Sequence, residues 1–232
     1  MTLARKALTI PVSERIGCVE ALLLRPAGAK RLLVLAHGAG AGMHHPFMER
    51  LSDELAGCQV ATLRYQFPYM QQQRKRPDPP VVLTATVRAA IGAALEAAPD
   101  LPLLAGGKSL GGRMTSTAVA EKRAGDSPGM ASVRGLVFFG FPLHAAGRPG
   151  IQRGEHLSKV QVPMLFLQGT RDTLADLALL RPFCDTLVPL STLHVIDGAD
   201  HSFHVPKRSG KTDADIVAEL ARTAESWADG VR

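Results

Sequence analysis

Residues 107–111 read Gly-Lys-Ser-Leu-Gly and fit the G-x-S-x-G pattern, which can place a nucleophilic serine on a sharp turn. An apolar run at residues 101–105 precedes this turn, and a segment compatible with a helix, residues 113–123, follows it. Flanking glycines fit because so tight a turn leaves no room for Cβ atoms beside the serine. Ser109 is therefore a candidate nucleophile, although a glycine-rich strand-to-helix turn of any α/β protein has the same local pattern.

A serine hydroxyl is almost wholly protonated at neutral pH, so it needs a base within hydrogen-bond reach. His201 follows a predicted strand and suits that role, because an imidazole can take a proton and return it near neutral pH. Asp172 follows another predicted strand, and a buried carboxylate there would hold the imidazole in the required tautomer. The chain order Ser109, Asp172, His201 is the one expected on the α/β-hydrolase fold.

Other residues near these could take the same roles. Asp197 and Asp200 lie close to His201 in the sequence and could supply the acid, or simply cap a turn. His204 lies just beyond His201, and Asp172 taken alone could cap the helix-like segment that follows it. The joint occurrence of serine, aspartate and histidine in this order, each just past a predicted strand, favours the triad.

The tetrahedral intermediate of acyl transfer carries an oxyanion, which needs hydrogen-bond donors already in place. The backbone N–H of Leu110 would be one donor, and the N–H of Ala39 in the glycine-rich segment 37–40 would be the second. Substrate-binding residues are expected from the same segments and from two others near strand ends. They are Gly40, Lys108, Phe141 and Phe203. The sequence does not explain why a long cation, Lys108, directly precedes the nucleophile.

The histidines also raise the question of a metal. His44 and His45 together with His201 and His204 could suggest a metal site, but no carboxylate–histidine spacing of a known type is present. His37 is expected to hold its own loop through a ring hydrogen bond. No cysteine occupies the position of the nucleophile. We therefore expect a serine mechanism with neither metal nor cofactor.

The elements that must position these residues alternate between strands and helices. An N-terminal antiparallel hairpin is expected from residues 8–12 and 16–25. An apolar run typical of a strand covered on both faces lies at residues 31–36. Further strands are expected at residues 59–64 and 101–105, and buried strands at residues 135–139, 164–167 and 192–196. Helices are expected at residues 46–55, 81–98, 113–123, 174–187 and 212–227. This alternation predicts a doubly wound, mostly parallel α/β sheet with ligands at the carboxyl ends of its strands.

Length and composition restrict the class of protein. A chain of 232 residues suits one well-packed α/β domain, so we expect a single domain over residues 1–232. The net charge is +6, but only residues 74–76 form a tight basic run and no nucleic-acid motif accompanies it, so we expect no nucleic-acid partner. No apolar window suits a signal peptide or a membrane span. Three widely spaced cysteines are typical of a reducing compartment, and we expect a cytoplasmic protein with no membrane partner.

Two loops bear on the substrate. Residues 66–80 form the one long irregular stretch, and such loops are functional or mobile as often as they are plain surface excursions. The α/β-hydrolase fold usually carries its lid in the segment that corresponds to residues 140–163. Here that segment is short and rich in glycine, so we expect no lid domain. An open site favours a small ester, lactone or thioester over a lipid. Basic residues could favour an anionic substrate, although a solvated basic face is the preferred interpretation; they are Arg74, Lys75, Arg76 and Arg113.

Five segments together carry a family resemblance: Leu-Ala-His-Gly-Ala-Gly at 35–40, Arg-Tyr-Gln-Phe-Pro-Tyr-Met at 64–70, Gly-Gly-Lys-Ser-Leu-Gly-Gly-Arg-Met at 106–114, Phe-Gly-Phe-Pro-Leu-His at 139–144, and Gly-Ala-Asp-His-Ser-Phe at 198–203. With them the chain resembles the α/β-hydrolase superfamily over almost its whole length, and more narrowly the compact, uncapped bacterial hydrolases near the dienelactone hydrolases. It also resembles the hydrolase-like domain of the testis-expressed and histone-acetyltransferase-complex (NSL-type) proteins.

The resemblance implies the α/β-hydrolase fold and a carboxylesterase-like serine hydrolase with the triad roles given above. Dienelactone hydrolases use a cysteine nucleophile, whereas this chain has Ser109, so their particular substrate does not follow. Some relatives are interaction modules without catalysis, which leaves a non-catalytic α/β-hydrolase-fold module as the alternative. That alternative requires a lost triad member, and all three candidates are present here. The oligomeric state does not follow from the sequence.

Overall fold

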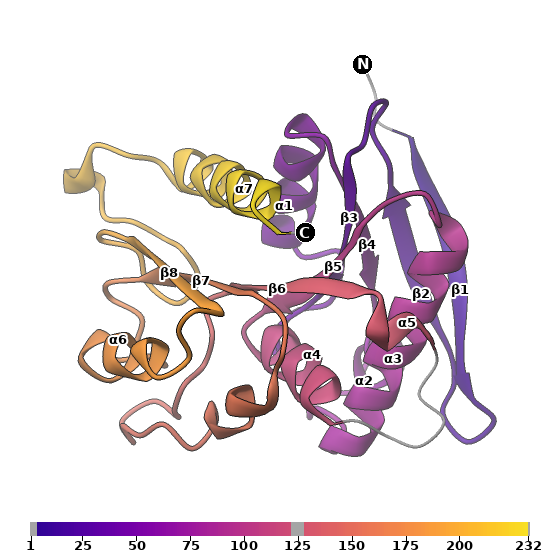
Figure 1. Cartoon of the computed structure of the whole chain (residues 1–232), viewed down its shortest axis with the longest axis horizontal. Coiled ribbons are helices and arrows are strands. Elements are labelled where there is room, and N and C mark those ends of the chain that lie inside the picture. The colour runs from indigo at the N-terminus through magenta and orange to yellow at the C-terminus, as the bar shows by residue number, and fades with distance from the viewer. Residues whose placement is uncertain (1–3, 122–127, 232) are drawn as a thin grey trace.

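The strands of the described chain form one twisted, mostly parallel sheet (Figure 1). The computed structural model describes residues 4–121 and 128–231. Within them the sheet has eight strands in the order β1-β2-β4-β3-β5-β6-β7-β8. The pairs from β4 through β8 are parallel, whereas β1–β2 and β2–β4 are antiparallel. The strands are β1 (Arg5–Ser13), β2 (Gly17–Leu24), β3 (Arg31–Ala36), β4 (Val60–Tyr65), β5 (Leu103–Lys108), β6 (Val133–Phe139), β7 (Met164–Gly169) and β8 (Ser191–Ile196).

Helices cover both faces of this sheet, as Figure 1 shows. On one face lie α1 (Pro46–Gly57) and α7 (Asp213–Asp229); on the other lie α2 (Pro68–Gln71), α3 (Pro80–Ala97), α4 (Leu110–Ala120), α5 (Pro128–Ala131) and α6 (Leu177–Asp185). Successive residues of β3 alternate between the faces: Leu33 and Leu35 pack with α1 and α7, and Leu32 and Val34 pack on the opposite side. Because both faces are covered, the strand is continuously apolar after Arg31. The predicted doubly wound sheet is confirmed.

One helix, α3, is long and apolar enough to cross a membrane when judged by length and composition alone. In this fold its Leu83, Val87 and Ile91 are buried in the core beneath the sheet. A helix that is apolar around most of its circumference is typical of a position inside a layered domain.

Several predicted boundaries need correction. The strand at 192–196 is not covered on both faces, because β8 is the edge of the sheet and is partly exposed. The helix after the serine turn begins at Leu110 rather than Arg113, and its predicted end at Arg123 lies outside the described residues. The helix predicted over 174–187 is shorter, because Asp176 caps it by accepting the N–H of Ala178. Residues 66–80 are not wholly irregular, since they contain α2.

The segment between β6 and β7 decides how open the site is. Within residues 140–163 the structure has a short 3-10 helix, η1 (Glu155–Lys159), and an isolated bridge between Ala145 and Arg148. A second 3-10 helix, η2 (Lys207–Ser209), precedes α7 far along the chain. No large lid domain is inserted in this described segment, as the sequence predicts.

Candidate active site

The turn between β5 and α4 holds Ser109 in a strained backbone conformation. Its φ is 50° and its ψ is −117°, a combination that costs a non-glycine residue about 1–3 kcal/mol. A Cβ at Gly107 would lie 2.4 Å from the carbonyl oxygen of Ala36, and one at Gly111 would lie 2.5 Å from that of His37. Both positions therefore require glycine for β3 to approach the turn. The local geometry is that of a nucleophile turn.

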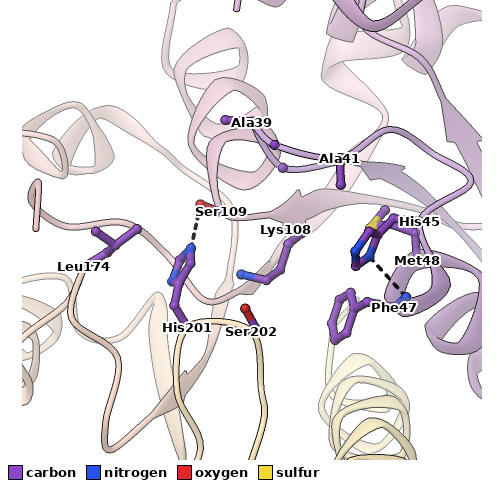
Figure 2. A pocket seen from close by; sticks show the side chains of 12 residues that line it. Ala39, Ala41, His45, Phe47, Met48, Lys108, Ser109, Leu174, His201 and Ser202 are labelled. Atoms are coloured by element: carbon purple, nitrogen blue, oxygen red, sulfur yellow. Dashed lines mark hydrogen bonds between the residues drawn. The ribbon is translucent and has the colours of Figure 1, made fainter. Parts of the chain in front are cut away.

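Three side chains from three different loops form one chain of hydrogen bonds. Nε2 of His201 lies 2.8 Å from Oγ of Ser109, and the dashed line in Figure 2 marks this contact. Nδ1 of His201 lies 2.7 Å from Oδ2 of Asp172. With its proton on Nδ1, the imidazole donates to Asp172 and can accept the hydroxyl proton of Ser109 at Nε2. The structure thus brings together the three residues that the sequence selects.

The carboxylate of Asp172 is held by the end of β7 and the loop after it. Its side chain is 1% exposed. Oδ1 accepts the N–H of Leu174 at 2.8 Å, and Oδ2 also accepts a hydrogen bond from the side-chain amide of Gln168. Gln168 is fully buried and was not among the predicted site residues. A glutamine at the end of an otherwise apolar strand was the signal that could have identified it, because a buried amide needs a partner.

The rival acids have other partners. Asp200 accepts two backbone N–H groups of the turn after His201, at 2.8 and 3.0 Å. Asp197 accepts a hydrogen bond from Thr170. His204 pairs with Asp213 at 2.9 Å on the surface. Asp200 therefore shapes the turn that carries the imidazole rather than contacting its ring.

His37 holds the loop after β3, as expected from the sequence. Its Nδ1–H donates to the carbonyl oxygen of Gly38 at 2.7 Å, and its Nε2 accepts the N–H of Phe67 at 3.0 Å. Burial lowers the pKa of this imidazole to about 4, so the ring stays neutral and can accept at one nitrogen. The hydroxyl of Tyr69 donates to the carbonyl oxygens of Gly38 and Ala39 at 3.2 and 3.0 Å.

Two residues at the end of β4 fix the far part of the same loop. Arg64 donates through Nη1 to the carbonyl oxygen of Met43 at 2.7 Å, and Oε1 of Gln66 accepts the N–H of Met43 at 3.0 Å. The sequence did not predict that this loop is held by Tyr69, Arg64 and Gln66. Their contacts with the loop depend on the packing of segments that are distant in the sequence.

The loop so held places one backbone donor near the nucleophile. The N–H of Ala39 and the N–H of Leu110 have no protein acceptor within residues 4–121 and 128–231. Leu110 is the first residue of α4, where helix N–H groups have no intrahelical partner. Both donors predicted for an oxyanion are therefore unoccupied by the protein.

Two hollows meet at Ser109, and both are bordered by Ala39 and Leu174. We name the first the His201 lobe; its volume is about 340 Å³, and Figure 2 shows it. Its lining includes Gly40, His45, Phe47, Met48, Lys108 and His201. We name the second the arginine lobe, with a volume of about 330 Å³. Its lining includes Pro77, Leu83, Leu110, Arg113, Pro142 and Arg153.

The sequence model of a family described as alpha/beta hydrolase domain matches residues 29–229. The chain belongs to the alpha/beta hydrolase family. The match covers most of the chain and includes every residue of the site described above. The resemblance found in the sequence is thereby confirmed at the level of the superfamily.

Solved structures of this fold are similar over nearly the full length of the hydrolase. A dienelactone hydrolase from Anabaena variabilis has a TM-score of 0.77 at 20% identity, over 100% of this chain and 99% of that one. A serine hydrolase without a lid from Xanthomonas campestris has 0.69 at 19%, over 98% and 96%. The esterase domain of a Rhodothermus marinus protein has 0.69 at 16%, over 99% of each chain. At these identities the likeness shows the fold; the resemblance to NSL-type proteins stays a prediction.

Of the four predicted substrate-binding residues, two line a lobe and two are buried in the protein. Gly40 and Lys108 line the His201 lobe. Phe203 instead lies behind it, buried and stacked on Phe47 with ring centroids 5.7 Å apart. Phe141 points into the core, where it is fully buried against Phe138 and Phe166. The structure thus corrects two of the four predictions, because both rings are already covered by protein.

Lys108 carries a buried cation beside Asp172 and His201. Although part of the residue is exposed, its Nζ is buried and has no hydrogen-bond partner among the described residues. Nζ lies 5.5 Å from the centroid of the Phe203 ring, and Figure 2 shows the side chain pointing toward His201. Burial lowers the pKa of this amine to about 8, against the attraction of Asp172 and Asp200. A charge in this position costs stability.

The histidines weighed as metal ligands do not gather at one point. In the described part of the hydrolase no group of three or more His, Cys, Asp or Glu side chains is placed to hold a metal ion. His45 instead caps α1 by accepting the N–H of Phe47 at 3.3 Å, and His44 lies near Glu49.

Proposed function

We propose that this hydrolase cleaves a small ester, lactone or thioester by acyl transfer through Ser109. The observation that carries the proposal is the hydrogen-bonded chain from Ser109 to His201 to Asp172, at 2.8 and 2.7 Å. The strained turn adds support, because it presents the hydroxyl beside two unoccupied backbone donors.

The first half of the proposed reaction forms the acyl-enzyme. Oγ of Ser109 attacks the carbonyl carbon while Nε2 of His201 takes its proton. The negative charge moves to the carbonyl oxygen, where the N–H groups of Ala39 and Leu110 stabilise it. His201 then returns the proton to the leaving oxygen or sulfur as that bond breaks. Asp172 holds the tautomer and stabilises the imidazolium throughout.

Water completes the cycle by the same route. His201 removes a proton from a water molecule that attacks the acyl carbon, and it gives the proton to Oγ of Ser109 as the acid departs. Neither step uses a metal or an organic cofactor. We further propose a free small molecule as substrate, without a nucleic-acid or membrane partner, in the cytoplasm. The free thiol of the exposed Cys18 favours such a reducing compartment.

Site variants assayed on para-nitrophenyl acetate test the proposal. Replacing Ser109 or His201 by Ala is expected to lower kcat by about 10⁴- to 10⁶-fold, as triad replacements do. Ser226→Ala, which changes an exposed serine on α7, is the matched control and should keep the wild-type rate. Near wild-type activity in Ser109→Ala would contradict the mechanism. If the wild type hydrolyses no ester at all, the non-catalytic module becomes the better interpretation.

A further inference from the structure

The arginine lobe contains two cations without a carboxylate partner. Arg113 comes from the first turn of α4, and Arg153 comes from the segment between β6 and β7. Nη1 of Arg153 donates to the carbonyl oxygen of His144 at 3.0 Å. Nε of Arg113 is buried without a hydrogen-bond partner, and neither arginine forms an ion pair with a carboxylate in the described part of the chain. Two arginines therefore line one hollow that Ser109 also borders.

Holding these two arginines close together lowers the stability of the folded protein. Burial lowers the pKa of Arg113, and repulsion from Arg153 adds to that effect. His156 also lies close by, with Nε2 bonded to Oγ of Ser116 at 2.8 Å. Burial and the charge of Arg113 lower the pKa of this imidazole to about 4, so it adds no positive charge at neutral pH. An anion bound in the hollow would relieve the repulsion between the two arginines.

An acid on the wall of the lobe does not offset these charges. Asp78 lines the hollow, but its Oδ1 already pairs with Arg74 at 2.6 Å. With Asp78 matched by Arg74, the charges of Arg113 and Arg153 are left unbalanced. The lobe thus has the net positive character that an oxyanionic group requires.

The position of His201 indicates which part of a substrate enters each lobe. His201 must give its proton to the leaving group, so the leaving group lies on the side that His201 lines. That side is the His201 lobe. The acyl chain is then directed to the arginine lobe, which Leu110 also lines with its free N–H.

We infer that the acyl chain of the substrate ends in a second, free carboxylate, which Arg113 and Arg153 hold. The substrate class is a half-ester or half-thioester of a dicarboxylic acid. This inference rests on the proposed function and narrows it. Guanidinium groups suit such a carboxylate because their planar arrangement of N–H donors matches its two oxygens.

A matched pair of substrates tests the inference. One is para-nitrophenyl hydrogen adipate, and the other is para-nitrophenyl methyl adipate, in which the same carboxylate is masked. The wild type is expected to prefer the charged ester by about 10- to 100-fold in kcat/KM, the usual effect of hydrogen bonds to a charged group. Arg113→Gln and Arg153→Gln should each lower this preference by about 10-fold, mainly through KM, and Arg113→Lys should restore part of it.

A control and the ionic strength separate this site from a general field. Arg76→Gln removes an exposed charge from the neighbouring loop and should leave the preference unchanged. Added salt should weaken the preference only partly, because screening is less effective for half-buried charges. Free adipate should inhibit hydrolysis of the neutral ester more strongly than inorganic phosphate does. The reverse order would overturn the choice of a carboxylate.

Two other outcomes would overturn the inference while leaving the proposed chemistry intact. The wild type would hydrolyse both esters without preference, or Arg76→Gln would lower the preference as much as Arg113→Gln does. In each case hydrolysis of the neutral ester, abolished by Ser109→Ala, shows that the acyl-transfer site works. Loss of the neutral reaction itself would instead contradict the proposed function.

Discussion

The His201 lobe and the arginine lobe flank the same serine, yet the positively charged residues that line them have different surroundings. Lys108 lines the His201 lobe, but its Nζ is buried close to the ring of Phe203. Arg113 and Arg153 line the other lobe. The amine of Lys108 is attracted by Asp172 and Asp200, whereas Arg113 and Arg153 repel each other and have no carboxylate partner in the described chain. The surroundings of each cation, not its residue type, therefore separate the two roles.

The largest expected effect on the His201 side comes from the acid. Asp172→Asn should leave the fold intact and lower kcat by about 10⁴-fold, because the amide favours the wrong tautomer of His201. Steady-state kinetics with thermal melts would check both parts. Asp200→Asn is the matched variant, since Asp200 bonds only the backbone of the turn in the described structure. A greater loss in Asp200→Asn than in Asp172→Asn would reverse the assignment.

The buried amine of Lys108 should make the free energy of unfolding depend on pH. Its pKa in the folded protein is about 8, below the ordinary value of 10.5, so between these values the unfolded chain binds more protons. Wild-type stability should therefore rise with pH across this window, and the buried charge should be most costly below pH 8. Lys108→Met should raise the free energy of unfolding at neutral pH by up to about 3 kcal/mol.

Urea unfolding of the wild type and Lys108→Met, at neutral pH and near pH 10, measures this difference. It should shrink as the pH rises, and the exposed Lys75→Met should show no such trend. A Lys108→Met protein less stable than the wild type at neutral pH would show that the amine has a stabilising partner.

The smallest effect concerns the length of a neutral acyl chain. Among para-nitrophenyl esters, kcat/KM should peak at acetate or butyrate and decline toward decanoate. The reason is that the arginine lobe has about 330 Å³ of space, cationic lining and no lid to cover a long apolar chain. Peak activity on decanoate would refute the assignment of acyl chains to this lobe.

Much of the fold follows from local signals in the sequence. The strand at 31–36 is predicted with its observed bounds, because after Arg31 it is a continuous apolar run, which is typical of a strand buried on both faces. The helix predicted from residue 212 is confirmed as α7, and Thr212 caps it by exchanging hydrogen bonds with Asp215. The edge position of β8 was not predictable, since strand order depends on which segments pair in space.

The functional site, like the fold, combines features that have a local signal in the sequence with features that have none. The nucleophile turn and the chain order of the triad candidates are local or sequential patterns, and they point to Ser109, Asp172 and His201. The contact between Gln168 and Asp172 is local in the sequence, whereas Arg113 and Arg153 come to line one lobe only when distant segments meet. The basic run at 74–76 is the tightest in the sequence, yet Arg74 forms an ion pair with the nearly buried carboxylate of Asp78. Phe141 lies just after the end of β6, where a site residue was expected, but its ring packs in the core.

The central claim is that Ser109 is an activated nucleophile, and labelling by a fluorophosphonate measures this most directly. Intact-protein mass spectrometry should show one phosphonyl group added to the wild type, and peptide mapping should place it on Ser109. Ser109→Ala should remain unlabelled, and His201→Ala should react far more slowly because the serine then lacks its base. An unmodified wild-type protein, or a label on a different residue, would contradict the account.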